Sequence, residues 1–174
     1  MTTALEMAKN RFLATLEIVR REINVLNYSS GRLFSFTIDK AWAERLRDDM
    51  QAAEILEAYV SRFGRLQDTI GDKLIPRALS ALVEKTGSML DNLNRAERLG
   101  WLDSVDAWVA TRELRNKLVH EYIKNAEYFA MDVKSAHQAE IMLKSVYIQL
   151  SGVALSRFNV TESGLASYYG DGVE

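Results

Sequence analysis

Side chains that could do chemistry are concentrated in one segment, Arg112–Tyr122, which has the sequence RELRNKLVHEY. Within it, Arg115, Asn116, His120 and Tyr122 form the pattern Arg-x4-His-x-Tyr with a polar residue after the arginine. Histidine exchanges a proton near neutral pH, so His120 could act as a general acid or base. A guanidinium binds phosphate oxygens in a planar two-point contact, which suits Arg115. The alternative is that His120 and Tyr122 pack in the core and satisfy hydrogen bonds there.

Other templates for catalysis are missing from the sequence. It has no cysteine, no glycine-rich phosphate loop, no HExxH pair and no GxSxG turn. The second histidine, His137, lies among Ser135, Gln138 and Glu140, a context that favours a surface side chain. We therefore expect neither a metal site nor a bound cofactor.

Helix geometry limits how the Arg-x4-His-x-Tyr residues can meet. At about 100° per residue, Arg115 and Tyr122 share one face of a helix, and Asn116 and His120 share a neighbouring face. Arg115 and His120 are about 140° apart around the axis, so one regular helix does not direct both at one atom. A loosened helix near His120 or a long reach by Arg115 would solve this. A two-fold dimer that lines one cleft with two copies of the helix is the simpler solution.

The elements that must position these residues are helices. Apolar residues repeat at steps of three or four along most of the chain, and capping residues mark several helix starts. Pro76 must end or kink the second helix, and Gly100 is suited to end the one that Ser88 begins. The expected helices cover 4–27, 39–74 with a short continuation to 83, 88–100, 105–123 and 132–158, with a connection at 28–38.

Composition supports an all-α protein. The chain has 174 residues, of which 48% are hydrophobic and 26% charged, with one proline and nine glycines, which is little material for the turns of an all-β fold. We expect an up-down antiparallel bundle of four to five main helices in one domain, 1–158, followed by a flexible tail, 159–174. The net charge of -2 gives no global reason to bind nucleic acid or membrane, and no segment is apolar enough for a membrane span. We expect a cytoplasmic protein.

The segment RNKLVHEY, preceded by AERLGWLDSVDAWVATREL, resembles the signature of the HEPN superfamily. It is specifically similar to the HepT branch, whose motif is Arg-x4-His-x-Tyr with a polar residue after the arginine. The stretch AERLRDDMQAAEILEAYVSRFGRLQDTIGDKLIP is similar to the helix that precedes the motif in that branch. The resemblance covers roughly residues 40–150.

The resemblance implies a helical bundle that forms a homodimer, with the motif in the dimer cleft. Many members of the family are metal-independent ribonucleases that act as toxins. HepT relatives are paired with a minimal nucleotidyltransferase antitoxin, which can attach AMP to the motif tyrosine. By this resemblance Arg115, Asn116 and His120 are catalytic residues acting on RNA, and Tyr122 is a modification site or positions a phosphate. The family's site often includes an upstream acidic residue, for which Asp68 is a candidate; a solvated or capping charge is the alternative.

Two other functions fit the same residues. In one, the chain is a non-catalytic partner of a nucleotidyltransferase, and Arg115, Asn116 and His120 bind a nucleotide or substrate without cleaving it. In the other, the chain is a structural helical dimer with a vestigial motif.

Overall fold

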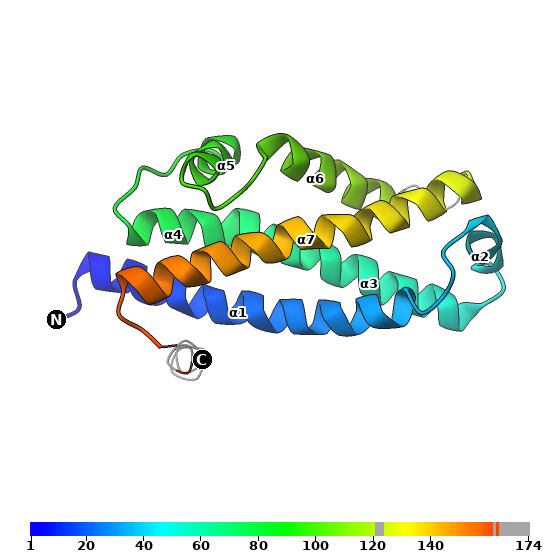
Figure 1. The fold of residues 1–174 in the computed structure, drawn as a ribbon, viewed down its shortest axis with the longest axis horizontal. Helices are drawn as coiled ribbons and strands as arrows, with labels where there is room; N and C mark the ends of the chain where they lie inside the picture. The colour runs from blue at the N-terminus through cyan, green and yellow to red at the C-terminus, as the bar shows by residue number, and fades with distance from the viewer. Residues whose placement is uncertain (121–123, 162, 164–174) are drawn as a thin grey trace. The chain divides into compact units, whose positions relative to one another are not determined.

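The computed structural model describes residues 1–120, 124–161 and 163, and every regular element in them is helical, with no strand among them. Figure 1 shows the helices in chain order. Their bounds are α1 Ala4–Leu33, α2 Lys40–Arg45, α3 Met50–Thr69, the π-helical turn η1 Ile70–Leu74, α4 Ile75–Ala81, α5 Met89–Arg98, α6 Val105–His120 and α7 Ala126–Arg157. The predicted all-α class is confirmed. No described helix combines the length and apolar character that crossing a bilayer requires.

The first helix is longer than the sequence predicts. The Thr3–Glu6 capping box forms, with the Thr3 amide donating to Glu6 and the Glu6 amide donating to Thr3. At the other end, α1 continues to Leu33 through Ser29 and Ser30, where a connection was expected. Both serines are buried, and their hydroxyls bond to side chains of other helices. These tertiary contacts outweigh the weak helix propensity of serine.

The second predicted helix is divided in the structure. Asp39 caps α2 as predicted, accepting a hydrogen bond from the Trp42 amide, but α2 ends at Arg45. Asp49 then accepts from the Ala52 amide at 3.0 Å and starts α3. A second local cap therefore interrupts an apolar repeat that is continuous in the sequence.

Pro76 lies at the start of α4, the short helix predicted to continue from it, and does not interrupt the helical path. The five-residue turn η1 joins α3 directly to α4, and Pro76 lies in the first turn of α4. In η1 the backbone bond runs from the Ile75 amide to the Ile70 carbonyl, the wider spacing of a π-helix. This extra residue per turn allows a proline that an uninterrupted α-helix would not accept.

The ends of α5 and the start of α7 follow local side-chain chemistry. Ser88 and Asp91 form the predicted capping box, and Gly100, with φ +77°, ends the helix as predicted. The last helix begins at Ala126, earlier than the predicted residue 132, because the Asn125 side chain accepts from the amides of residues 127 and 128. Most of the predicted tail lies outside the described residues.

The chain divides into two compact units. The first comprises 1–21, 68–105 and 143–174, and the second comprises 22–67 and 106–142. In the first unit, Phe12 of α1 contacts Phe158 edge to face, and Arg77 of α4 donates to Thr15 of α1 at 2.7 Å. The second unit has its own core, in which Trp42 lies parallel to Phe129. It contains the arginine and asparagine of the motif.

Candidate functional site

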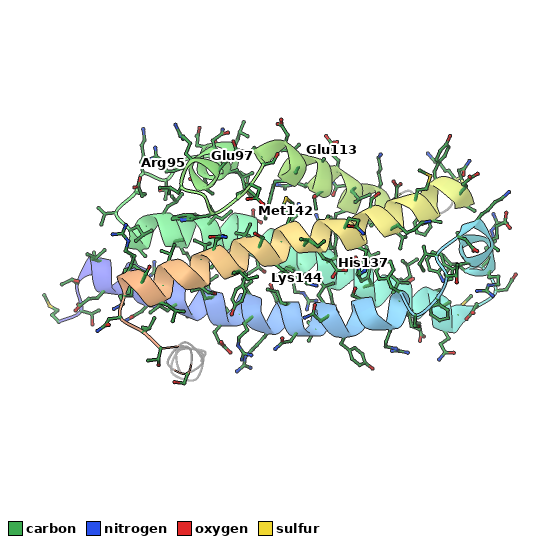
Figure 2. The ribbon with its side chains drawn as sticks, in the orientation of Figure 1. Arg95, Glu97, Glu113, His137, Met142 and Lys144 are labelled. Atoms are coloured by element: carbon green, nitrogen blue, oxygen red, sulfur yellow. The ribbon has the colours of Figure 1, made fainter. Side chains whose placement is uncertain are left out.

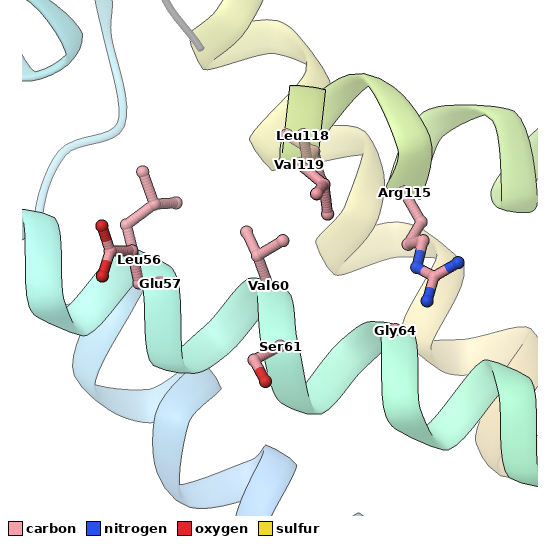
Figure 3. A pocket seen from close by; sticks show the side chains of 8 residues that line it. All are labelled: Leu56, Glu57, Val60, Ser61, Gly64, Arg115, Leu118 and Val119. Atoms are coloured by element: carbon pink, nitrogen blue, oxygen red, sulfur yellow. The ribbon is translucent and has the colours of Figure 1, made fainter. Parts of the chain in front are cut away.

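Arg115 extends from α6 across α3, and Gly64 leaves room for it (Figure 3). A Cβ atom built on Gly64 would lie 2.7 Å from Arg115 Nε and 3.3 Å from its Cγ. Glycine inside a helix costs about 0.5–1 kcal/mol relative to alanine. Gly64 is buried in the interior of α3, so the close approach of the arginine side chain gives a physical reason for a glycine there.

A pocket of about 480 Å³ opens beside this crossing. Figure 3 shows α3 along one side and α6 along the other. Its polar lining residues are Arg115, Glu57 and Ser61. The remaining lining residues are Leu56, Val60, Gly64, Leu118 and Val119. A cation beside an apolar surface can bind the anionic part of a ligand and orient it.

Packing and a hydrogen bond hold the start of α6 against α3. Trp108 is buried, and its backbone carbonyl accepts a hydrogen bond from Gln67 Nε2 of α3 at 3.2 Å. Leu118, near the other end of α6, is also buried. The two anchors flank Arg115, so the guanidinium is attached to a segment fixed on both sides.

The structure places two of the four predicted site residues. Arg115 is half-buried in the pocket, whereas Asn116 is exposed beside it. His120 is the last residue of α6, and its side chain lies outside the described part of the chain. Tyr122 also lies outside the described residues. The meeting of the four side chains therefore stays a prediction.

The pocket of Arg115 is also lined by an acidic residue that the sequence did not single out. Glu57 of α3 lines this pocket, whereas the part of Asp68, the candidate proposed from the sequence, stays a prediction. Glu57 precedes Gly64 by seven residues, which is two helical turns. This spacing could have indicated Glu57 if the crossing point of α6 had been known.

His137 is a surface histidine, as its sequence context favours, but its side chain also contacts a buried carboxylate. Its side chain is 45% exposed, but Nδ1 lies 3.1 Å from Oε1 of the buried Glu140. The hydroxyl of Tyr59 donates to the same oxygen at 2.8 Å. Burial and the Glu140 charge raise the pKa of Tyr59, so this hydroxyl remains a donor. The three-residue spacing of His137 and Glu140 was the available signal.

Neither compact unit shows a metal centre in its described residues. Within 1–120, 124–161 and 163, no three His, Cys, Asp or Glu side chains are grouped to hold an ion. Comparisons of the chain with models of protein families, with curated proteins and with solved structures find no match.

Proposed function

We propose that this chain is a HepT-like toxin, a metal-independent endoribonuclease that acts through Arg115, Asn116, His120 and Tyr122. The observation that supports this most directly is the Arg115 guanidinium, which lines an open pocket instead of packing in the core. A permanent cation at the edge of a cavity can bind a phosphodiester and stabilise the charge that develops on it. The sequence resemblance supplies the reaction class.

The proposed reaction is attack of an RNA 2′-hydroxyl on the adjacent phosphorus. The 2′-oxygen forms a bond to phosphorus, the bond to the 5′-oxygen breaks, and the products are a cyclic phosphate and a 5′-hydroxyl. His120 takes the proton from the 2′-hydroxyl or delivers one to the leaving oxygen. Arg115 binds the non-bridging oxygens, while Asn116 bonds the phosphate or fixes the His120 tautomer. The Tyr122 hydroxyl positions a phosphate oxygen.

The proposed active form is a homodimer with a composite site. Arg115 faces the α3 pocket, whereas Asn116, the next residue, is exposed outside it. His120 follows Asn116 by four residues on the regular helix α6, about 140° from Arg115. A two-fold axis beside α6 would bring the arginine of one chain toward the histidine of the other, and would supply two histidines for the two proton transfers.

Control by a partner minimal nucleotidyltransferase follows from the same resemblance. Transfer of AMP from ATP to the Tyr122 hydroxyl, with release of pyrophosphate, would add bulk and negative charge where the RNA phosphate must bind. RNA would then be repelled and excluded from the cleft.

Cleavage of labelled RNA in EDTA by the purified full chain tests the proposal. We expect cleavage by the unmodified protein, loss of about 100-fold or more in Arg115→Ala and His120→Ala, and partial activity in Arg115→Lys. Arg112→Ala is the matched control, because Arg112 is exposed on the same helix and lies outside the motif. Intact RNA together with nucleotide binding that depends on Arg115 would instead establish the non-catalytic partner function.

Co-expression with the nucleotidyltransferase tests the proposed control. We expect the intact mass to increase by one AMP per chain, the increase to be absent in Tyr122→Phe, and RNA cleavage to stop in the modified protein. Sedimentation should show a dimer. If the chain stays unmodified and toxic when it is co-expressed with an active nucleotidyltransferase, the proposed regulation by AMP transfer is refuted.

A further inference from the structure

A second polar cluster lies in the same compact unit, away from the Arg115 motif in the sequence. Tyr59 of α3, Ser30 of α1 and His137 of α7 all approach Oε1 of Glu140, at 2.8, 2.9 and 3.1 Å. Glu140 itself is 2% exposed. Three helices therefore contribute donors to a single buried oxygen.

This arrangement fixes the state of the imidazole. Burying a carboxylate is unfavourable unless donors surround it, and an oxygen that receives several donors is suited to the ionised form. The carboxylate accepts, so Nδ1 of His137 carries the proton and donates to it. The second ring nitrogen, Nε2, is on the opposite side of the ring and is left for another partner.

Aromatic packing also fixes the plane of the ring. Phe34 stacks on His137 with ring centroids 3.9 Å apart, and it packs edge to face with Tyr59. Tyr59 therefore makes two contacts: its hydroxyl donates to Glu140, and its ring packs against Phe34, which stacks on His137. A half-exposed histidine needs no such support for stability alone, whereas a histidine that binds a ligand does.

A pocket of about 410 Å³ lies against His137, in the size range of small-molecule sites. Figure 2 marks His137 on α7. One wall is apolar and comes from the segment between α1 and α2, and the other is polar and comes from α7. The lining residues are Phe34, Phe36, Ile38, Lys134, Ser135, His137 and Gln138. None of these described lining residues is acidic, and Lys134 contributes a positive charge.

We propose that this pocket is a second binding site, for a small ligand in which a flat ring carries an anionic group. The anionic group binds the Lys134 ammonium, while His137 Nε2, which carries no proton, accepts a hydrogen bond from an N–H or O–H of the ring. The Ser135 hydroxyl lines the pocket but already donates to the Met131 carbonyl at 3.0 Å. The ring packs against Phe36 and Ile38. Nucleoside monophosphates and aromatic carboxylates share this chemistry. The site is independent of the ribonuclease function proposed above.

Calorimetric titration of the full chain with four probes tests the ligand class. AMP and indole-3-acetate each combine a ring with an anion, whereas adenosine and inorganic phosphate each supply one part. We expect at least one combined probe to bind about tenfold more tightly than either part alone. AMP binding alone identifies a nucleotide site, and indole-3-acetate binding alone identifies a carboxylate site. Equal binding of the parts and the combined probes would refute the class.

Variants test the location of the site. Lys134→Gln should weaken binding about tenfold, and Lys73→Gln, an exposed lysine of the first unit, should leave it unchanged. His137→Phe keeps a ring to stack on Phe34 but removes Nε2, and it should weaken binding by a similar factor. If His137→Phe unfolds the protein, Lys134→Gln still decides the question. Binding unaffected by Lys134→Gln, or no binding of any probe at 5 mM, about the weak limit of a useful site, would overturn the proposal.

Discussion

Gly64→Ala separates the positioning of Arg115 from the stability of the fold. The added Cβ would lie 2.7 Å from Arg115 Nε, whereas ordinary contacts begin at 3.4 Å, so the guanidinium must move by about 0.7 Å. The nearest atoms all belong to a flexible side chain. The arginine is therefore expected to move, while α3 and α6 keep their places.

The two free-energy terms of this substitution oppose each other. Alanine in a helix interior is favoured over glycine by about 0.5–1 kcal/mol. Forcing a side chain away from its preferred rotamer costs about 0.5–1.5 kcal/mol. The free energy of unfolding should therefore change by no more than about 1 kcal/mol. Catalysis is far more sensitive, because a displacement near 1 Å can lower a rate about 100-fold.

Urea unfolding and RNA cleavage in EDTA, measured on the same preparations, provide the assay. We expect Gly64→Ala to unfold near the parent midpoint and to cleave RNA between about 10 and 100 times more slowly. Gly152→Ala is the matched control, since it makes the same change inside α7 and its Cβ would meet nothing within 4 Å. The control should gain about 0.5–1 kcal/mol and keep its activity.

Two results would refute this reasoning in different ways. Full activity in Gly64→Ala, with activity lost in Arg115→Ala, would show that Arg115 works without the position that Gly64 allows. A loss of more than about 2 kcal/mol in stability would show that the arginine cannot move aside. Unchanged activity in both Gly64→Ala and Arg115→Ala would instead refute the proposed function of Arg115.

Three further predictions concern the first compact unit. Val83 is 78% exposed and adopts φ +60° directly after α4, a backbone conformation in which glycine is usual. Val83→Gly should therefore raise the free energy of unfolding, measured by urea titration, by about 1 kcal/mol. A lower free energy of unfolding would contradict this prediction. Gly100 holds the equivalent place after α5 at φ +77°, and Gly100→Ala should lower stability by about 1 kcal/mol in the same assay; no change would count against it. The Arg20 guanidinium lowers the pKa of Glu17 despite burial, so this pair should stabilise the fold above the ordinary glutamate pKa and lose its effect as pH falls through the lowered value. Acid titration of Arg20→Gln should show a smaller loss of stability over that range than the parent, and an identical curve would refute it.

Features that depend on contacts between residues close in the sequence could be predicted from it. The Ser88–Asp91 box, the Asp39 cap and the Gly100 stop each depend on side chains and backbone groups no more than one turn away. Such contacts are fixed by spacing alone. The all-helical class follows for the same reason, since it sums many local preferences.

Features decided by distant helices could not be predicted. Ser29 and Ser30 have the composition of a connection, yet both are buried in α1 and bond to residues of α3 and α7. Gly64 lies within an apolar repeat that keeps its register, and only the crossing of Arg115 gives a reason for a glycine there. Sequence spacing shows which residues share a helix face, and packing decides which face meets which.

The same distinction applies to the two candidate sites. The motif identified Arg115 because the pattern lies within a few consecutive residues, but Glu57, which lines the same pocket, comes from α3. His137 and Glu140 are close in sequence, whereas the donor that completes their cluster from α3 is Tyr59. Each site joins a local pair or motif to a partner from another helix, and only the local part was visible.

Both sites occur where the second unit departs from what a helical bundle needs for stability alone. A glycine inside α3 weakens the helix, and a buried carboxylate such as Glu140 costs free energy that an apolar residue would not. Val83 in the first unit is also unfavourable, yet it is exposed and lines neither of the two pockets. An unfavourable residue therefore indicates function only where it shapes a cavity or orients a group that faces one. By this criterion, substitution at Gly64 should alter cleavage more than stability, and Val83→Gly should alter stability alone.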